Sequence, residues 1–203
     1  KFILKHAILL VLFLASLVNF SQEKYPKDYF RSPMDIPIIL GGTLGEASTL
    51  TYEEKKVLMR ETVKLVEGKV PVIINIAEQT TKGAIHAAEV AQECGATGLM
   101  MLPPMRYKAN DYETVTYFKE TAKSTELPIM IYNNPIDYGI MVTLDMLEEL
   151  TVCENIQAVK ESTRDISNIT RIKTRFGDRL NVLTGVDTLG LESTIMGADG
   201  WVA

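Results

Sequence analysis

From residue 36 onward, short apolar runs rich in isoleucine, valine and methionine alternate with longer amphipathic stretches. The apolar runs predict strands at residues 36–40, 70–76, 98–102, 127–132, 156–160, 180–184 and 200–203. The stretches between them predict helices at roughly 52–67, 82–94, 111–124, 143–151, 165–176 and 188–196. Because the strands are apolar throughout and are separated by helices, we expect them to be parallel and covered on both faces. The predicted class is α/β.

Three of the predicted helices have clear start signals. Thr51, Asn110 and Thr143 each stand directly before a helical stretch with acidic residues in its first turn. A threonine or asparagine in that position can accept a hydrogen bond from a free backbone N–H of the first turn. We therefore expect these three residues to be N-caps.

Polar residues and glycines cluster just after the predicted strands, at residues 42–46, 78–81, 103–106, 132–135, 160–163 and 185–187. A closed (β/α)8 barrel uses all such loops to build one site at its C-terminal face, whereas an open sheet uses only those near one switch point. The sequence contains neither a G-x-G-x-x-G motif after a strand nor a P-loop. The pattern therefore favours a TIM barrel.

The first 22 residues differ from the rest of the chain. Lys1 and Lys5 precede an apolar run from Ala7 to Val18, which is followed by small and polar residues. This pattern is typical of an export signal, and the run is shorter than the about 20 residues of a membrane-spanning helix. We expect a signal-like segment at 1–22, a linker at 23–37 and a partial barrel at 38–203, with no stable membrane span once the signal is removed.

Composition and charge exclude several classes of function. The formal net charge is −5 and no basic block occurs, so nucleic acid is not an expected partner. The two histidines do not form a metal-binding pattern, so no metal is expected. Cys94 and Cys153 are predicted to be free, buried thiols.

The run "NIQAVKESTRD" at 155–165 ends its apolar part on Lys160, which is an unusual last residue for a buried strand. A lysine in this position can extend to water, or it can face a pocket and act as an amine nucleophile. Tyr132 ends the preceding predicted strand, so the two side chains are expected to face the same pocket. A tyrosine hydroxyl beside the amine could transfer protons, and it could equally well cap a loop.

Four segments together resemble the dihydrodipicolinate synthase / N-acetylneuraminate lyase family. They are "GGTLGEASTLTYEEK" (41–55), "YNNP" (132–135), "AVKESTRD" (158–165) and "LTGVDTLGLESTIMGADGWVA" (183–203). The resemblance implies a (β/α)8 barrel that acts on 2-oxo acids through a lysine Schiff base, without a metal or other cofactor. It identifies Lys160 as that lysine, and it implies a cytoplasmic homo-oligomer, either a dimer or a tetramer.

The resemblance also assigns the neighbouring residues. Gly42, Thr43 and the Leu44 amide would hold the carboxylate of the 2-oxo acid, and Thr43 and Tyr132 would belong to the proton relay. Gly185 would leave room for the substrate, and Arg106 would contact it.

Three residues depart from the pattern of the synthases in this family. Leu44 replaces a second threonine, Arg106 replaces a tyrosine, and Asp137 replaces an arginine that would hold a substrate carboxylate. These departures favour a subgroup that contains the hydroxyproline-pathway hydroxy-pyrroline-carboxylate deaminase and dehydratases or aldolases of sugar-derived acids. Dihydrodipicolinate synthase, in lysine biosynthesis, is the alternative.

A further alternative concerns the N-terminal part. The stretch "QEKYPKDYFRSPMDIPIIL" at 22–40 resembles the start of secreted metallopeptidases of the lysostaphin type. The barrel would then lack its first βα unit and its last helix. On this hypothesis the chain is an exported, catalytically silent chimeric fragment, whose signal conflicts with a cytoplasmic location.

Overall fold

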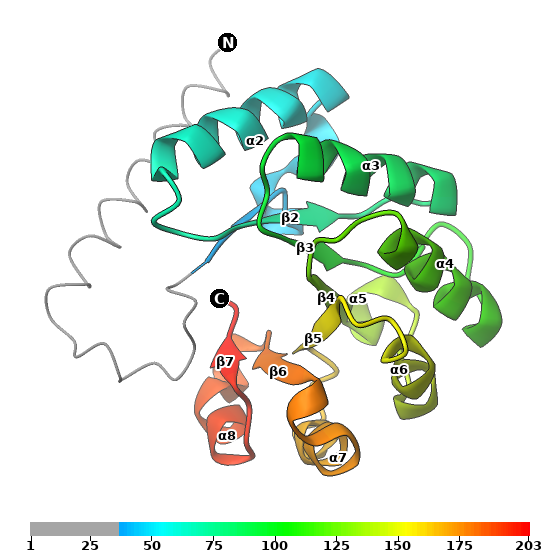
Figure 1. Cartoon of the computed structure of the whole chain (residues 1–203). Coiled ribbons are helices and arrows are strands. Elements are labelled where there is room, and N and C mark those ends of the chain that lie inside the picture. Colours follow the sequence, from blue (N-terminus) through cyan, green and yellow to red (C-terminus); the bar gives the residue numbers. More distant parts are fainter. Residues whose placement is uncertain (1–36) are drawn as a thin grey trace, which may run out of the picture. The chain divides into compact units, whose positions relative to one another are not determined.

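The computed structural model describes residues 37–203 (Figure 1). These residues form two compact units. One unit contains the described residues up to Ile74 together with Val90–Gly98, and the other contains Asn75–Glu89 and Leu99–Ala203. The signal-like segment predicted at 1–22 and nearly all of the linker predicted at 23–37 lie outside the described residues.

The first unit is built on two parallel strands. Strand β1 (Ile38–Leu40) pairs with β2 (Val72–Ile76), with Ile38 opposite Val72. Between them lie two short 3-10 helices, η1 (Thr43–Gly45) and η2 (Ala47–Thr49), and helix α2 (Tyr52–Val66). The Thr97 backbone N–H donates to the Val72 carbonyl oxygen at 2.8 Å, and the Thr97 hydroxyl accepts from the Val72 N–H at 2.8 Å.

The second unit holds a parallel sheet in which each strand pairs with the next one in the chain. Its strands are β3 (Gly98–Met101), β4 (Ile129–Asn133), β5 (Ile156–Glu161), β6 (Asn181–Thr184) and β7 (Gly200–Trp201). Its helices are α4 (Asp111–Lys123), α5 (Pro135–Tyr138), α6 (Leu144–Leu150), α7 (Ser167–Phe176) and α8 (Gly190–Ile195), with short 3-10 turns η3 (Gly177–Arg179) and η4 (Asp187–Leu189). Figure 1 shows α4, α6, α7 and α8 along the outer side of these strands. Strand β2, helix α3 (Thr81–Glu93) and strand β3 each have residues in both units.

The elements predicted from the hydrophobic pattern are confirmed, and their ends differ by a few residues at most. The predicted caps are also confirmed. The Thr51 side chain accepts from the Glu54 N–H at 3.3 Å, and the Asn110 side chain accepts from the Glu113 N–H at 2.9 Å. Thr143 caps α6 in the same way. The four-residue helix α5 and the 3-10 turns were not predicted, because segments this short carry no hydrophobic periodicity.

The strand register separates two rows of residues at the carboxyl end of the sheet in the second unit. Tyr132, Lys160 and Leu183 are register partners on β4, β5 and β6. One residue further along, Asn133, Glu161 and Thr184 are partners, and all three are buried. Because side chains alternate along a strand, the second row faces the helices and the first row faces the opposite side of the sheet.

The α/β class is confirmed, and the described strands and helices are those of part of a (β/α)8 barrel. The two cysteines are free thiols, as predicted. Cys94 is buried, but Cys153 is only partly buried because it lies in the turn after α6. The expectation of two buried thiols was therefore wrong for Cys153.

Candidate active site

Lys160 and Tyr132 lie side by side near the C-terminal ends of β5 and β4. The Lys160 side chain is buried, with 9% of the residue exposed, and its Nζ lies 4.3 Å from the centroid of the Tyr132 ring. A cation at this distance from the face of a tyrosine ring is attracted by the ring quadrupole. Each strand continues one residue beyond the predicted end, so Asn133 and Glu161 are the last strand residues. The structure therefore brings together the amine and the aromatic ring that the sequence predicted to be neighbours.

Gly185 leaves space for the Lys160 side chain. A Cβ at residue 185 would lie 2.5 Å from Lys160 Cε and 2.2 Å from Ser162 Oγ, which is far too close for non-bonded atoms. The Gly185 N–H also donates to the Glu161 carbonyl oxygen at 2.9 Å, which holds the backbone in this position. The glycine is thus required by the close approach of a lysine, a more specific reason than the general space for substrate expected from the sequence.

Ser162 presents a buried hydroxyl at the same place. Its Oγ has no hydrogen-bond partner among the described residues, and only 3% of the residue is exposed. Ser162 stands two residues after Lys160, so the two side chains share one face of the chain. An unsatisfied buried hydroxyl costs free energy unless something binds it, which makes Ser162 a candidate contact for a bound molecule. In the sequence, its only signal was its place in "KEST", directly after the strand that carries the lysine.

The loop after β4 covers the Tyr132 ring and hydroxyl. Asn134 Nδ2 donates to the Tyr132 hydroxyl oxygen at 3.3 Å and to Asp137 Oδ2 at 2.7 Å. The Tyr138 ring packs edge-on against Tyr132, with centroids 5.4 Å apart and an interplanar angle of 81°. Asp137 is exposed on α5 and brings a negative charge to this loop. These contacts orient the phenol that neighbours the amine.

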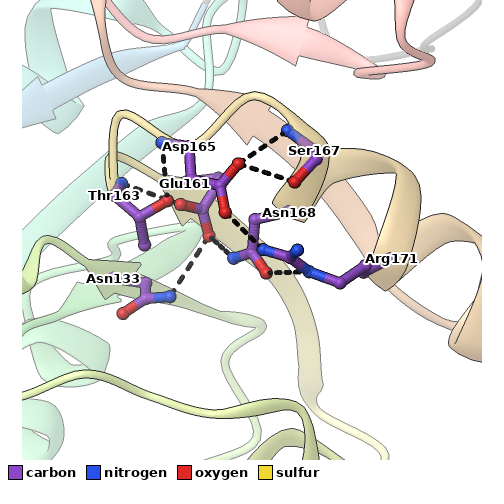
Figure 2. A network of polar contacts seen from close by, with 7 residues as sticks. All are labelled: Asn133, Glu161, Thr163, Asp165, Ser167, Asn168 and Arg171. Carbon is purple, nitrogen blue, oxygen red and sulfur yellow. Dashed lines mark hydrogen bonds and ion pairs between the residues drawn. The ribbon is translucent and has the colours of Figure 1, made fainter.

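Glu161 is a buried carboxylate that the sequence reasoning did not single out. Its Oε2 accepts from Asn168 Nδ2 at 2.8 Å and from Asn133 Nδ2 at 3.2 Å, and its Oε1 accepts from the Thr163 N–H at 2.8 Å (Figure 2). Burial raises the pKa of Glu161 above its ordinary value, and the hydrogen bonds from Thr163, Asn168 and Asn133 oppose that shift. The hydrophobic pattern indicated only a polar end of the strand at this position.

The other predicted site residues belong to the loops after β1 and β3. Thr43 and Leu44 are part of η1 in the first unit, where Thr43 is exposed and Gly42 precedes the helix with an ordinary extended backbone. Their approach to Lys160 stays a prediction. Arg106 lies on the exposed turn after β3, with its guanidinium 5.9 Å from the centroid of the Tyr107 ring. Arg106 and Lys160 are not joined by a hydrogen bond among the described residues, and the proposed contact of Arg106 with a substrate stays a prediction.

Over residues 37–203, no set of three or more histidine, cysteine or acidic side chains is arranged to bind a metal ion. In the same residues, no helix combines the length and the apolar character that crossing a membrane requires.

Within the second unit, parallel strands in chain order with helices along their outer side and a buried lysine near a strand end are consistent with part of a (β/α)8 barrel. Residues 34–203 match the model of the "Dihydrodipicolinate synthetase family". The chain belongs to this family.

Similar proteins share this fold. The 4-hydroxy-tetrahydrodipicolinate synthase of Oceanobacillus iheyensis is 34% identical over 166 residues, which are 82% of this chain and 56% of that protein. The crystal structure of dihydrodipicolinate synthase from Aquifex aeolicus superposes with a TM-score of 0.83 and 31% identity, over 95% of this chain and 63% of that one. The dihydrodipicolinate synthase of Bacillus anthracis gives a TM-score of 0.82 and 33% identity, with the same coverage of 95% and 63%. This chain thus spans little more than half the length of the curated relative.

Proposed function

We propose that this chain carries the reactive lysine of a lyase that acts on a 2-oxo acid through a Schiff base. The observation that carries the proposal is the Lys160 amine, buried and 4.3 Å from the centroid of the Tyr132 ring, on the face of β5 that Gly185 keeps open. Membership of the family supports this assignment. No metal or other cofactor is needed, because the imine itself withdraws electrons from the substrate.

In the proposed reaction, the lone pair on Lys160 Nζ attacks the C2 carbonyl carbon of the 2-oxo acid. The carbonyl oxygen takes up two protons in succession and leaves as water, and the nitrogen gives up both of its protons, so the product is a neutral imine. A phenol next to the amine is placed to give and receive these protons, which is the role proposed for Tyr132. Ser162 Oγ, which has no protein partner among the described residues, is available to donate a hydrogen bond to the bound acid.

The carboxylate of the substrate is proposed to bind at the loop after β1. Thr43 supplies a hydroxyl there, and Gly42 and Leu44 supply backbone N–H groups, which suit an anionic oxygen. Arg106 is proposed as a second contact because its side chain is exposed and positively charged. A homo-oligomer, dimer or tetramer, is the assembly proposed by family resemblance.

Two co-substrate classes are candidates. The residues favour the hydroxyproline-pathway deaminase or a sugar-acid dehydratase or aldolase, because Asp137 would repel a second substrate carboxylate. The relatives favour 4-hydroxy-tetrahydrodipicolinate synthase. A curated protein and two proteins of known crystal structure, each more than 30% identical to this chain, are named as 4-hydroxy-tetrahydrodipicolinate or dihydrodipicolinate synthases. By similarity alone, the synthase is the better supported of the two.

The lysine assignment is tested by trapping. The full chain is incubated with pyruvate and sodium borohydride, and the reduced adduct is located by peptide mass spectrometry. We expect the adduct on Lys160 and its absence in Lys160→Ala. Lys82 and Lys108 serve as internal controls in the same digest, since an adduct on either of them would overturn the assignment. No adduct at all would favour the catalytically silent fragment.

The co-substrate is tested by adding aspartate semialdehyde to the pyruvate-loaded protein. Formation of the cyclic dihydrodipicolinate product would establish the synthase and exclude the subgroup that Asp137 favours. Release of 2-oxoglutarate semialdehyde and ammonia from the hydroxy-pyrroline-carboxylate would establish the deaminase.

A further inference from the structure

We infer that Glu161 is a positioning residue for the Lys160–Tyr132 pair, which it holds together from the opposite face of the sheet. Glu161 and Asn133 are register partners on β5 and β4, and the residues directly before them are Lys160 and Tyr132. The outward pair is joined by the hydrogen bond from Asn133 Nδ2 to Glu161 Oε2. We call Glu161 and the residues that donate hydrogen bonds to it, Asn133, Thr163 and Asn168, the clamp. The clamp fixes the ends of β4 and β5, which carry Tyr132 and Lys160.

The first arm of this clamp runs through Asn133 to the loop that covers Tyr132. Asn133 Oδ1 accepts from the Val142 N–H at 3.0 Å, and its Nδ2 donates to the Val142 carbonyl oxygen at 3.1 Å. These two bonds attach the far end of the loop to β4. The near end of the same loop supplies Asn134 and Tyr138, which contact the Tyr132 hydroxyl and ring. Movement of Asn133 would therefore displace the residues that orient the phenol.

The second arm runs through the loop after β5 to helix α7. Asn168 Nδ2 donates to Glu161, and the Arg171 guanidinium contacts Asn168 Oδ1 at 3.4 Å and Asp165 Oδ2 at 2.5 Å (Figure 2). The Thr163 N–H donates to the other carboxylate oxygen. This arm fixes the turn that follows Ser162, the residue with the unsatisfied hydroxyl beside Lys160.

The three donors require an acceptor with two free oxygens. An ionised carboxylate offers lone pairs to all of them and has no proton of its own to place. A glutamine has one oxygen and one NH2 group, so at least one of the three N–H groups would face another donor. Asn133 cannot turn its amide over to compensate, because both of its ends are bonded to Val142. Glu161→Gln is therefore expected to open the clamp while it preserves the size of the side chain.

The chain offers a matched control at the other end of β5. Asn155 directly precedes this strand, and its Nδ2 donates to the carbonyl oxygens of Ala122, Thr125 and Leu127 at 2.9, 3.0 and 3.4 Å. Asn155→Ala removes a hydrogen-bond cluster of similar size at the opposite end of β5 from Lys160 and Glu161. Both variants should lower the urea midpoint, and only Glu161→Gln should affect the Lys160–Tyr132 pair. Asn168→Ala gives a milder opening of the clamp should Glu161→Gln fail to fold.

The positioning itself is measured without any reaction. The full chain is labelled with ¹³C-lysine, and the Cε signal of Lys160 is assigned by its loss in Lys160→Arg. Because Nζ lies over the Tyr132 ring, the attached Cε protons should be displaced upfield by the ring current. We expect the displacement in the wild-type protein and in Asn155→Ala, and its loss or reduction in Glu161→Gln or Asn168→Ala. An unchanged displacement in the folded Glu161 and Asn168 variants would overturn the inference.

The catalytic consequence rests on the proposed imine chemistry and is measured by the rate of borohydride trapping at a series of pyruvate concentrations. The saturating rate should fall by about tenfold or more in Glu161→Gln, because small misplacements of reacting groups are costly. The pyruvate concentration at half-saturation and the rate in Asn155→Ala should stay close to wild type. Equal slowing in Glu161→Gln and Asn155→Ala would show that Glu161 has a structural role and does not position the pair. An absence of adduct in the wild type, with the ring-current result as expected, would refute the proposed function and leave the positioning role in place.

Discussion

Replacement of Gly185 by alanine is the sharpest test of how the lysine is held. The new Cβ would lie 2.5 Å from Lys160 Cε and 3.0 Å from Lys160 Cγ. Non-bonded carbon atoms prefer about 3.5–4.0 Å, so the lysine side chain would have to retreat by roughly 1 Å. The backbone cannot move away easily, because the Gly185 N–H is bonded to the Glu161 carbonyl oxygen. Ser162 Oγ can rotate away, and the lysine stem has to be displaced as a whole.

A displacement of about 1 Å at a reacting group can lower the rate by about 10²-fold, and overpacking of this kind costs about 1–3 kcal/mol of stability. We expect Gly185→Ala to trap pyruvate at Lys160 about 10²-fold more slowly than wild type while remaining folded. Gly200→Ala on the neighbouring strand is the control, since its Cβ would come no closer than 3.5 Å, to Leu183 Cδ2. Trapping of Gly185→Ala at the wild-type rate would refute the reasoning.

Three further outcomes are expected. Tyr132→Phe should slow turnover by about 10²–10⁴ with an unchanged circular dichroism spectrum, and a rate within a factor of about two of wild type would remove Tyr132 from the proton relay. Asp137→Arg should improve the use of aspartate semialdehyde over pyruvate alone, because it replaces a repulsive charge with an attractive one; steady-state product formation measures this, and no gain would mean that the carboxylate binds elsewhere. Burial raises the pKa of Glu161, so the folded protein binds a proton at this carboxyl group more tightly than the unfolded chain does. The contribution of Glu161 to stability is therefore greatest below the ordinary glutamate pKa of 4.5 and is lost as the pH rises through the raised pKa. In urea titrations above pH 4.5, the free energy of unfolding should therefore fall more steeply with pH in wild type than in Glu161→Gln, and parallel curves would contradict the raised pKa.

The parts of the fold that repeat along the chain could be predicted from the sequence. Buried parallel strands are apolar throughout, and helices of the outer layer alternate with them, so both types of element leave a long signal. The caps Thr51, Asn110 and Thr143 could also be predicted, because a cap depends only on residues that are neighbours in the sequence. Helix α5 was missed because its four residues are too few to show a period.

The candidate site was predicted in part. Lys160 and Tyr132 could be paired because parallel strands bring their C-terminal ends together. Glu161 could not be recognised, because a glutamate at a strand end is ordinarily solvated, and only the tertiary structure brings the amides of Asn133 and Asn168 to it. The unsatisfied hydroxyl of Ser162 could not be predicted from the sequence either, because only the three-dimensional structure shows that no hydrogen-bond partner lies near it among the described residues.

The alternation of side chains at the end of β5 limits how this segment can change in length. Lys160 and Ser162 face one side of the sheet, and Glu161 faces the other side, toward Asn168. A single residue inserted into β5 before Lys160 would exchange these faces and place the amine against the helix and the carboxylate against Tyr132. The backbone hydrogen bond from the Ser162 N–H to the Asn133 carbonyl oxygen holds the end of β5 in register with β4. Among relatives of this chain, we therefore expect β5 to vary by substitution alone, and changes of length to be confined to the turns between the outer helices and the strands.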